Sequence, residues 1–289
     1  MRKSILILMT LGAMLLGALS ISIGQVLTDT EGNVISIRRN EHFATFLTLA
    51  TYEGTSWREC MFRTALCPNN CGHSGNMATF SVDKYIVYAK FHEYGDGKDG
   101  KFLVLIDNGE NTKPLIDEKS YETIKSLKKG DRVLLSWNHL YVTETVGEFK
   151  SQFPERPINL ILPITEKQAK FIPDVAAPKT EDGFEGMLRR YYVALASFSG
   201  RVEGVDLFQV DRHLHTYFYG DVATMEYLAV MAFNPNTTNQ KIVDDIKNLK
   251  AGDFAIVAFR RDMVGNSSVD TPLFVLPETQ QRAEALLKN

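Results

Sequence analysis

The chain has 289 residues, with 32 lysines and arginines against 35 aspartates and glutamates, so its formal net charge at pH 7 is −3. A mildly acidic chain is a poor candidate for binding the phosphate backbone of nucleic acids, which attracts basic surfaces. Hydrophobic residues make up 44% of the sequence, which is enough to bury real cores and excludes a largely disordered chain.

The N-terminus has the features of an export signal. Arg2 and Lys3 precede an apolar run over residues 4–23, and small residues ending at Ser20 and at Gly24 offer two cleavage points. The same run is long enough to span a bilayer, so an uncleaved anchor is the alternative. We therefore expect an exported protein, periplasmic or secreted, that touches a membrane only if this segment is retained.

All three cysteines of the chain lie within fourteen residues, together with one histidine: Cys60, Cys67, Cys71 and His73. Thiolate and imidazole are preferred ligands of zinc, and three cysteines with one histidine form an accepted structural zinc set. Gly72 lies among them, and a tight turn lets several side chains converge on one ion. The cluster predicts a structural zinc site made of these four residues.

Three other interpretations of this cluster remain open. Export favours a disulfide, which would leave one free thiol because the cysteine count is odd. Cys67 and Cys71 could instead handle copper or take part in thiol redox chemistry. With water in place of His73, a zinc ion would permit hydrolysis, and Glu59 is the nearest carboxylate in sequence.

Two strands are predicted after the cysteine cluster. Residues 77–91 and 101–107 are rich in apolar and β-branched side chains, which favours strands. The Asp-Gly pairs between them are typical of a hairpin loop.

A ten-residue pattern occurs twice, at 124–133 and at 246–255, an offset of 122 residues. In each copy the apolar spacing predicts a short amphipathic helix, then a glycine suited to a helix C-cap, then a strand with alternating apolar residues. Those alternating residues are Val133, Leu135 and Trp137 in the first copy, and Ala255, Val257 and Phe259 in the second. A short apolar strand closes each half, at 158–164 and at 272–276.

Strand-like runs also precede the second helix, at 191–205, 205–219 and 226–233. The order of strands, helix and two further strands resembles that of the OB-fold, a five-stranded barrel with its helix between strands three and four. We therefore expect a mainly β (α+β) protein with two tandem small β-barrel, OB-like domains, each with one helix before its last two strands. A generic α+β pair that shares a common turn is the alternative.

Composition predicts where these domains begin and end. The segment before residue 184 is rich in proline, aspartate and small residues, as linkers are. The expected division is an export segment over 1–24, a first domain over 25–172, a linker over 173–183 and a second domain over 184–289. The cysteine cluster belongs to the first domain only, which suits a site added to a scaffold.

A second candidate site lies in the second half, on the predicted strand 205–219. Strict alternation would place Asp211, His213, His215 and Tyr217 on one face. Such a row could bind a metal, or it could contact a polymer ligand through its aromatic rings. An ordinary solvent-exposed sheet face is the alternative.

No nucleophile elbow, phosphate loop, dinucleotide fingerprint or His-Glu-x-x-His motif occurs in the sequence. We therefore expect a non-enzymatic binding or scaffolding protein of the cell envelope, whose partner is an envelope protein or a polymer ligand and not a nucleic acid. A thiol-redox or copper-handling protein that uses Cys67 and Cys71 is the first alternative, and a metal-dependent hydrolase is the second.

Overall fold

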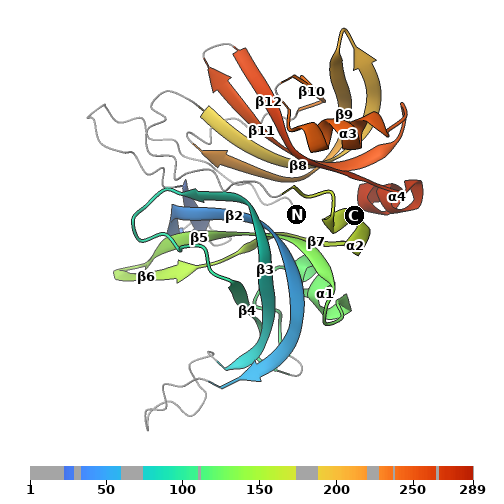
Figure 1. The fold of residues 1–289 in the computed structure, drawn as a ribbon. Helices are drawn as coiled ribbons and strands as arrows, with labels where there is room; N and C mark the ends of the chain where they lie inside the picture. The colour runs from blue at the N-terminus through green and yellow to red at the C-terminus, as the bar shows by residue number, and fades with distance from the viewer. Residues whose placement is uncertain are drawn as a thin grey trace.

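The computed structural model describes residues 23–28, 34–59, 74–109, 112–173, 188–219, 228–236, 238–264 and 267–288. These residues form a mainly β fold of two antiparallel sheets with short helices (Figure 1). The first sheet contains β1 (Ile23–Thr28), β2 (Val34–Arg58), β3 (Gly75–Lys90), β4 (Lys101–Asp107), β5 (Arg132–Val146), β6 (Phe149–Glu155) and β7 (Ile158–Ile164). The second contains β8 (Leu188–Val202), β9 (Val205–Tyr219), β10 (Val230–Phe233), β11 (Phe254–Val264) and β12 (Ser267–Pro277). The helices are α1 (Glu118–Ser126), α2 (Glu166–Ala169), α3 (Gln240–Lys247) and α4 (Gln280–Lys288).

The two sheets share a strand order. The first runs β4-β3-β2-β5, with β6 and β7 both paired to β5 and β1 paired to β2; the second runs β10-β9-β8-β11-β12. The sequence predicted most of these strands but not β1, β2 or β6. Of these, β2 is 25 residues long and pairs with β1, β3 and β5 along its length. Residues 43–50 of β2 are all buried, because its two faces pack into different cores. An extra residue in β2, Phe43 against β5 and Glu53 against β3, also shifts its alternation. Together these features hide the period-2 signal on which strand prediction depends.

The repeated pattern forms the same turn in both halves. The N–H of Gly130 donates to Tyr52 O at 2.8 Å, and the N–H of Gly252 donates to Phe198 O at 2.8 Å. The two glycines have φ of +95° and +91°, a region that favours residues without a Cβ. Each turn therefore joins a helix to the next strand and is hydrogen-bonded to the strand beside it, β2 in the first half and β8 in the second.

The role expected for these two glycines was wrong in one respect. The helices end at Ser126 and at Lys247, before the glycines are reached. Leu127 is the C-cap of α1 and has an extended backbone. The positive φ is needed in the turn after the helix, so the glycines do not cap the helices themselves.

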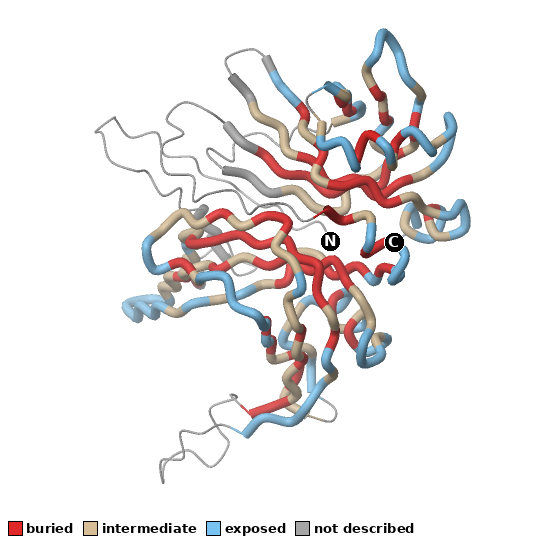
Figure 2. The backbone as a smooth tube through the Cα atoms, in the orientation of Figure 1, coloured by how far each residue is buried: buried red, intermediate tan, exposed pale blue. Residues whose placement is uncertain are grey.

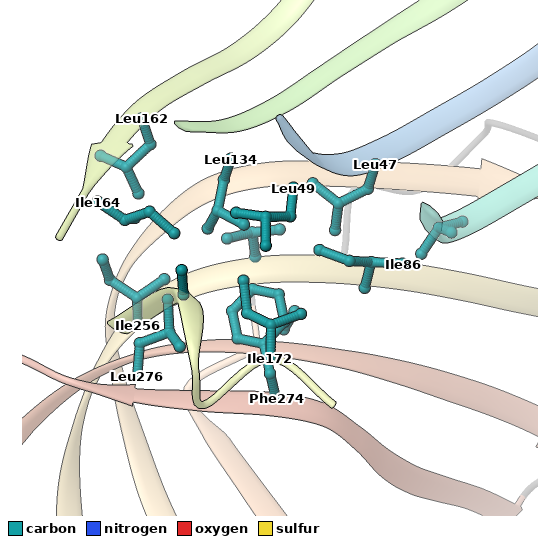
Figure 3. Close-up of a cluster of buried hydrophobic side chains, with 14 of the residues drawn as sticks. Leu47, Leu49, Ile86, Leu134, Leu162, Ile164, Ile172, Ile256, Phe274 and Leu276 are labelled. Carbon is teal, nitrogen blue, oxygen red and sulfur yellow. The ribbon is translucent and has the colours of Figure 1, made fainter. Parts of the chain in front are cut away.

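Alternation along β5 and β11 assigns their residues to three cores. The odd-numbered apolar residues of β5 face a core inside the first sheet, and those of β11 face a core inside the second. The residues between them, Leu134 and Ile256, belong to a third core between the two sheets (Figure 3). Figure 2 shows the buried stretches of both sheets where they meet. The two halves therefore pack together through apolar side chains from both sheets.

The predicted closed barrels are not found. Within the described residues, backbone pairing leaves β4 and β10 as edges and does not join either of them to the strand at the far side of its sheet. The second sheet comes nearest to closure, where the N–H of Ala232 on β10 donates to the Asp270 side chain on β12 at 3.4 Å. Two open sheets are the architecture that the pairing supports.

Two sequence-based expectations fall wholly or partly on residues outside the described ranges. The export segment lies outside them up to residue 22, and the expected linker lies outside them from residue 174 onward. Both stay predictions. No helix among the described residues is long and apolar enough to cross a membrane.

Candidate functional site

A cleft of about 610 Å³ lies between the two halves. The first half contributes α1 and β7 to its walls, and the second half contributes β9 and α4. A second hollow of about 400 Å³ continues it along β7 and shares Leu162, Pro163 and Leu286 with it. The volume of the cleft is in the range of ligand-binding pockets, and such pockets commonly lie at a boundary between packed units.

The wall formed by α1 is lined with hydroxyl groups. Asp117 caps the helix by accepting the N–H of Ser120 at 2.9 Å. The hydroxyl of Thr123 donates to Lys119 O at 2.8 Å, and the hydroxyl of Ser126 donates to Thr123 O at 2.7 Å. Because these two hydroxyl protons are used within the helix, the oxygens that remain toward the cleft act as acceptors. The sequence analysis did not identify this row, although its i, i+3 spacing was visible.

The wall formed by β9 contains the two histidines of the second candidate site. Val193 of β8 pairs with His215 and Ala194 pairs with His213, so Leu214 is a bulge between them. Directly opposed residues share a face, and consecutive positions of β8 face opposite sides of the sheet. The bulge therefore turns His213 and His215 to different faces, and the row expected from strict alternation is not kept.

The two histidines have different surroundings. His213 packs against the Tyr192 ring at 5.8 Å between centroids, and its Nε2 lies 3.2 Å from Leu228 O. His215 shares the face of the core between the sheets, and burial lowers its pKa to about 3. Asp211 is exposed, and Tyr217 lies on the backbone of β9 opposite Tyr191, with a side chain outside the described set. His215 therefore contributes a neutral imidazole to the cleft.

Two cations border the cleft from opposite halves. Lys119 lies exposed on α1, and Arg212 on β9 donates from Nη1 to Leu286 O at 2.6 Å. Neither forms an ion pair with another residue in the described part of the chain. Asp117 is the one carboxylate among the residues that line the larger hollow, and it accepts the hydrogen bond that caps α1. The cleft therefore has positive charge available in a chain whose overall charge is negative.

The structure brings together three other histidines that the sequence analysis did not single out. Phe43 stacks on His92 at 4.5 Å and meets the edge of His139 at 5.4 Å, and His42 lies on the same strand. Burial is the main cause that lowers the pKa of His42 and of His139. They come from segments about fifty residues apart, so no local pattern could have shown the cluster.

The contacts of His139 decide what this cluster can do. Its Nδ1 accepts the backbone N–H of Asp96 at 3.0 Å, so that nitrogen carries no proton. The Asp96 carboxylate is held by Arg156 through two hydrogen bonds of 2.7 and 2.9 Å. Oδ1 of Asp96 also lies 3.2 Å from Nδ1, but in the neutral ring Nδ1 accepts the backbone N–H and has no proton to donate to this carboxylate, as a catalytic histidine–carboxylate pair requires. The contacts instead fix the loop between β3 and β4 over the first sheet.

The cysteine cluster lies outside the described residues, from Cys60 through Cys67 and Cys71 to His73. The residues that flank the cluster are described: Arg58 at the end of β2 pairs with Gly75 at the start of β3. Among the residues that the structure does describe, no group of three or more histidines, cysteines, aspartates or glutamates is arranged to hold a metal ion. The zinc site stays a prediction.

Comparison with known proteins finds no match. Neither a protein-family model, nor a curated protein, nor a solved structure is similar to this chain. The function is therefore inferred from the chain's own residues, beginning with the polar groups that line the cleft between the halves.

Proposed function

We propose that this chain is an exported, non-enzymatic binding protein whose ligand occupies the cleft between its two halves. One observation carries the proposal: the cleft combines an apolar floor from β7 with hydroxyl, imidazole and cationic groups that come from both halves. Ligand sites commonly pair an apolar lining with a few converging polar groups. A purely scaffolding protein has no need of such a cleft.

The shared strand order of the two sheets supports a further part of the proposal. We propose that the halves are copies of one OB-like unit that remains open instead of closing into a barrel. The matching turns support this, because Lys128 N donates to Asp131 Oδ2 at 2.7 Å and Lys250 N donates to Asp253 Oδ2 at 2.8 Å. In such an arrangement the cleft is the place where the copies meet, and neither copy alone would form it.

The loop with Cys60, Cys67, Cys71 and His73 keeps its proposed role as a structural zinc site in the first half. Its ligand types support this, and a bound zinc would add folding free energy where the loop leaves and rejoins β2 and β3. Metal analysis with a thiol count on protein purified without chelator tests it. One zinc per chain, with thiols protected until chelation, is the expected result. One disulfide with one free thiol and no metal would exclude zinc and favour the disulfide or the redox alternative.

Filling the cleft tests the main proposal. Thr123→Trp on α1 projects a large ring into the cleft, and Glu122→Trp places the same ring on the exposed side of the same helix. Saturation-transfer NMR would be recorded with amino acids, dipeptides, small dicarboxylates and monosaccharides as probes. We expect at least one class to bind the wild type and the Glu122 variant but not the Thr123 variant. Equal binding by all three proteins, or by none, would exclude the cleft as the binding site.

A further inference from the structure

We propose that the occupant of the cleft is an extended acidic peptide that adds to β7 as an additional strand. This deepens the proposed function and rests on the cleft being the binding site. It follows from three properties of the cleft: its course along a strand, the direction of the backbone groups of that strand, and the charge at its rim.

The first property is the course of the cleft. Its two hollows together touch every residue of β7 from Ile158 to Ile164. Seven residues of strand span about 23 Å, which is long enough to pair with a short peptide segment. β7 pairs with β5 on one side, and no described strand pairs with its other edge. Unpaired strand edges of this kind are templates for a further strand.

The second property is the direction of the backbone groups at that edge. Pro163 lies opposite Val133 and has no N–H. A proline is tolerated in a strand where its nitrogen faces away from the neighbouring strand, so the backbone of Pro163 is directed away from β5. Its carbonyl accepts a hydrogen bond from Arg282 on α4, which lies on the side away from β5. Backbone groups alternate along a strand, so Ile161, two residues earlier, also directs its N–H and C=O away from β5.

Strand β5 supports the same assignment independently. Asp131, which directly precedes β5, accepts through its carbonyl the N–H of Tyr52 on β2. Backbone groups alternate along a strand, so the odd-numbered residues of β5 direct their N–H and C=O toward β2. Leu135 is an odd-numbered position, and it is the residue opposite Ile161. Leu135 O also accepts the Thr48 hydroxyl of β2 at 3.0 Å. Ile161 therefore has its backbone donor and acceptor at the cleft edge.

The third property is charge. Lys119 and Arg212 lie on opposite walls, with β7 between them, and have no carboxylate partner in the described part of the protein. The other two arginines along β7 are already committed: Arg132 lies 3.6 Å from Asp83, and Arg282 lies 3.3 Å from Glu278. A peptide that pairs with β7 would thus meet a cation on each side. Charge complementarity of this kind selects an acidic sequence.

A labelled seven-residue peptide of alternating valine and glutamate, blocked at both ends, is the probe. Fluorescence anisotropy would measure its binding beside two controls, one with lysine for glutamate and one with every backbone nitrogen methylated. We expect the acidic peptide to bind at least about tenfold more tightly than either control, because the lysine peptide reverses the charge and the methylated peptide cannot pair. Hydrogen exchange at the Ile161 amide should slow when the acidic peptide binds.

Charge reversal on the protein completes the test. Lys119→Glu and Arg212→Glu, alone and together, should weaken binding of the acidic peptide, by about tenfold or more for the pair. Lys125→Glu is the matched control, because it changes the same helix outside the cleft. Circular dichroism and thermal unfolding would establish that each variant is folded.

Each other outcome overturns the proposal in a distinguishable way. Equal binding of the acidic and the methylated peptides would exclude strand addition. A slow Ile161 amide in the free protein would show that the chain itself covers this edge. If the acidic peptide does not bind while Thr123→Trp removes binding of a small probe, the cleft is a small-ligand site and only the peptide is excluded. If the acidic peptide does not bind and Thr123→Trp removes binding of no small probe, the proposed function is excluded as well.

Discussion

Gln168 of α2 donates a hydrogen bond from Nε2 to Oε1 of Glu278 at 2.7 Å, across 110 positions of sequence. The same nitrogen lies 3.1 Å from Pro277 O, and its amide oxygen accepts from Arg282 Nη1 at 3.0 Å. Glu278 has a side chain only 2% exposed, and burial is the main cause that raises its pKa. This polar contact fastens the first half to the second beside the apolar core between the sheets.

Removing the Gln168 side chain should destabilise the protein through this contact. Gln168→Ala removes one partner of the buried Glu278 carboxylate and one acceptor of Arg282, which keeps its contacts with Glu278 and with Pro163 O. We expect a loss of about 1–3 kcal/mol in the free energy of unfolding, the usual cost of leaving a buried polar group without a hydrogen-bond partner. Urea unfolding measures it. Gln152→Ala, at an exposed glutamine of β6, is the control and should change stability by less than about 0.5 kcal/mol.

Gly75 should not tolerate a side chain. A Cβ at this position would lie 2.1 Å from Asp107 O, and that oxygen belongs to the backbone of β4 and cannot move aside freely. Gly75→Ala should therefore cost about 1–3 kcal/mol or more, as overpacking in a core does. Gly97→Ala meets nothing within 4 Å and should be close to neutral. Equal stability of the two variants, measured by chemical denaturation, would contradict this geometry.

Acid should destabilise the folded protein through its neutral histidines. Burial lowers the pKa of His215 to about 3, and the pKa values of His42 and His139 are also lowered. Below the unfolded pKa of about 6.5, the unfolded chain takes up protons that the folded chain does not, so stability falls as the pH falls. For His215 the free energy of unfolding should fall by up to about 2 kcal/mol between pH 7 and pH 5, since each pH unit below the unfolded pKa contributes about 1.4 kcal/mol.

His215→Leu provides the test of this dependence. The variant should flatten the decline in stability between pH 7 and pH 5, measured by urea unfolding at each pH. His92→Leu is the control, because it removes a histidine whose side chain is 32% exposed and lies outside the core between the sheets. A decline of unchanged slope in the His215 variant would show that other groups cause the acid sensitivity.

The two matching turns should contribute equally to stability. Asp131→Ala and Asp253→Ala each remove one acceptor of a backbone N–H, at 2.7 and 2.8 Å. Each should cost about 0.5–1.5 kcal/mol, the usual net worth of such a hydrogen bond. The double variant should show the sum, because distant independent sites are additive. Asp99→Ala, at an exposed loop carboxylate, is the control. A cost at one turn only would argue against equivalent halves.

Local patterns in the sequence were sufficient to predict most of the fold. The helix, turn and alternating strand at 124–133 and 246–255 were predicted, because each depends on residues a few positions apart. The strands 101–107 and 158–164 were placed with the bounds that they have. The alternation of β9 failed because a bulge shifts its period by one residue, and the long β2 was missed mainly because residues 43–50 are buried on both faces.

What the sequence by itself determined is therefore where most of the strands and helices lie and which residues of β5 and of β11 share a core. Only the tertiary structure decided that Leu134 and Ile256 meet between two open sheets, and that Lys119, Pro163 and Arg212 border one cleft. These residues are brought together by packing between segments as much as a hundred residues apart. That packing depends on the summed shape of many side chains, which no short spacing in a single chain encodes.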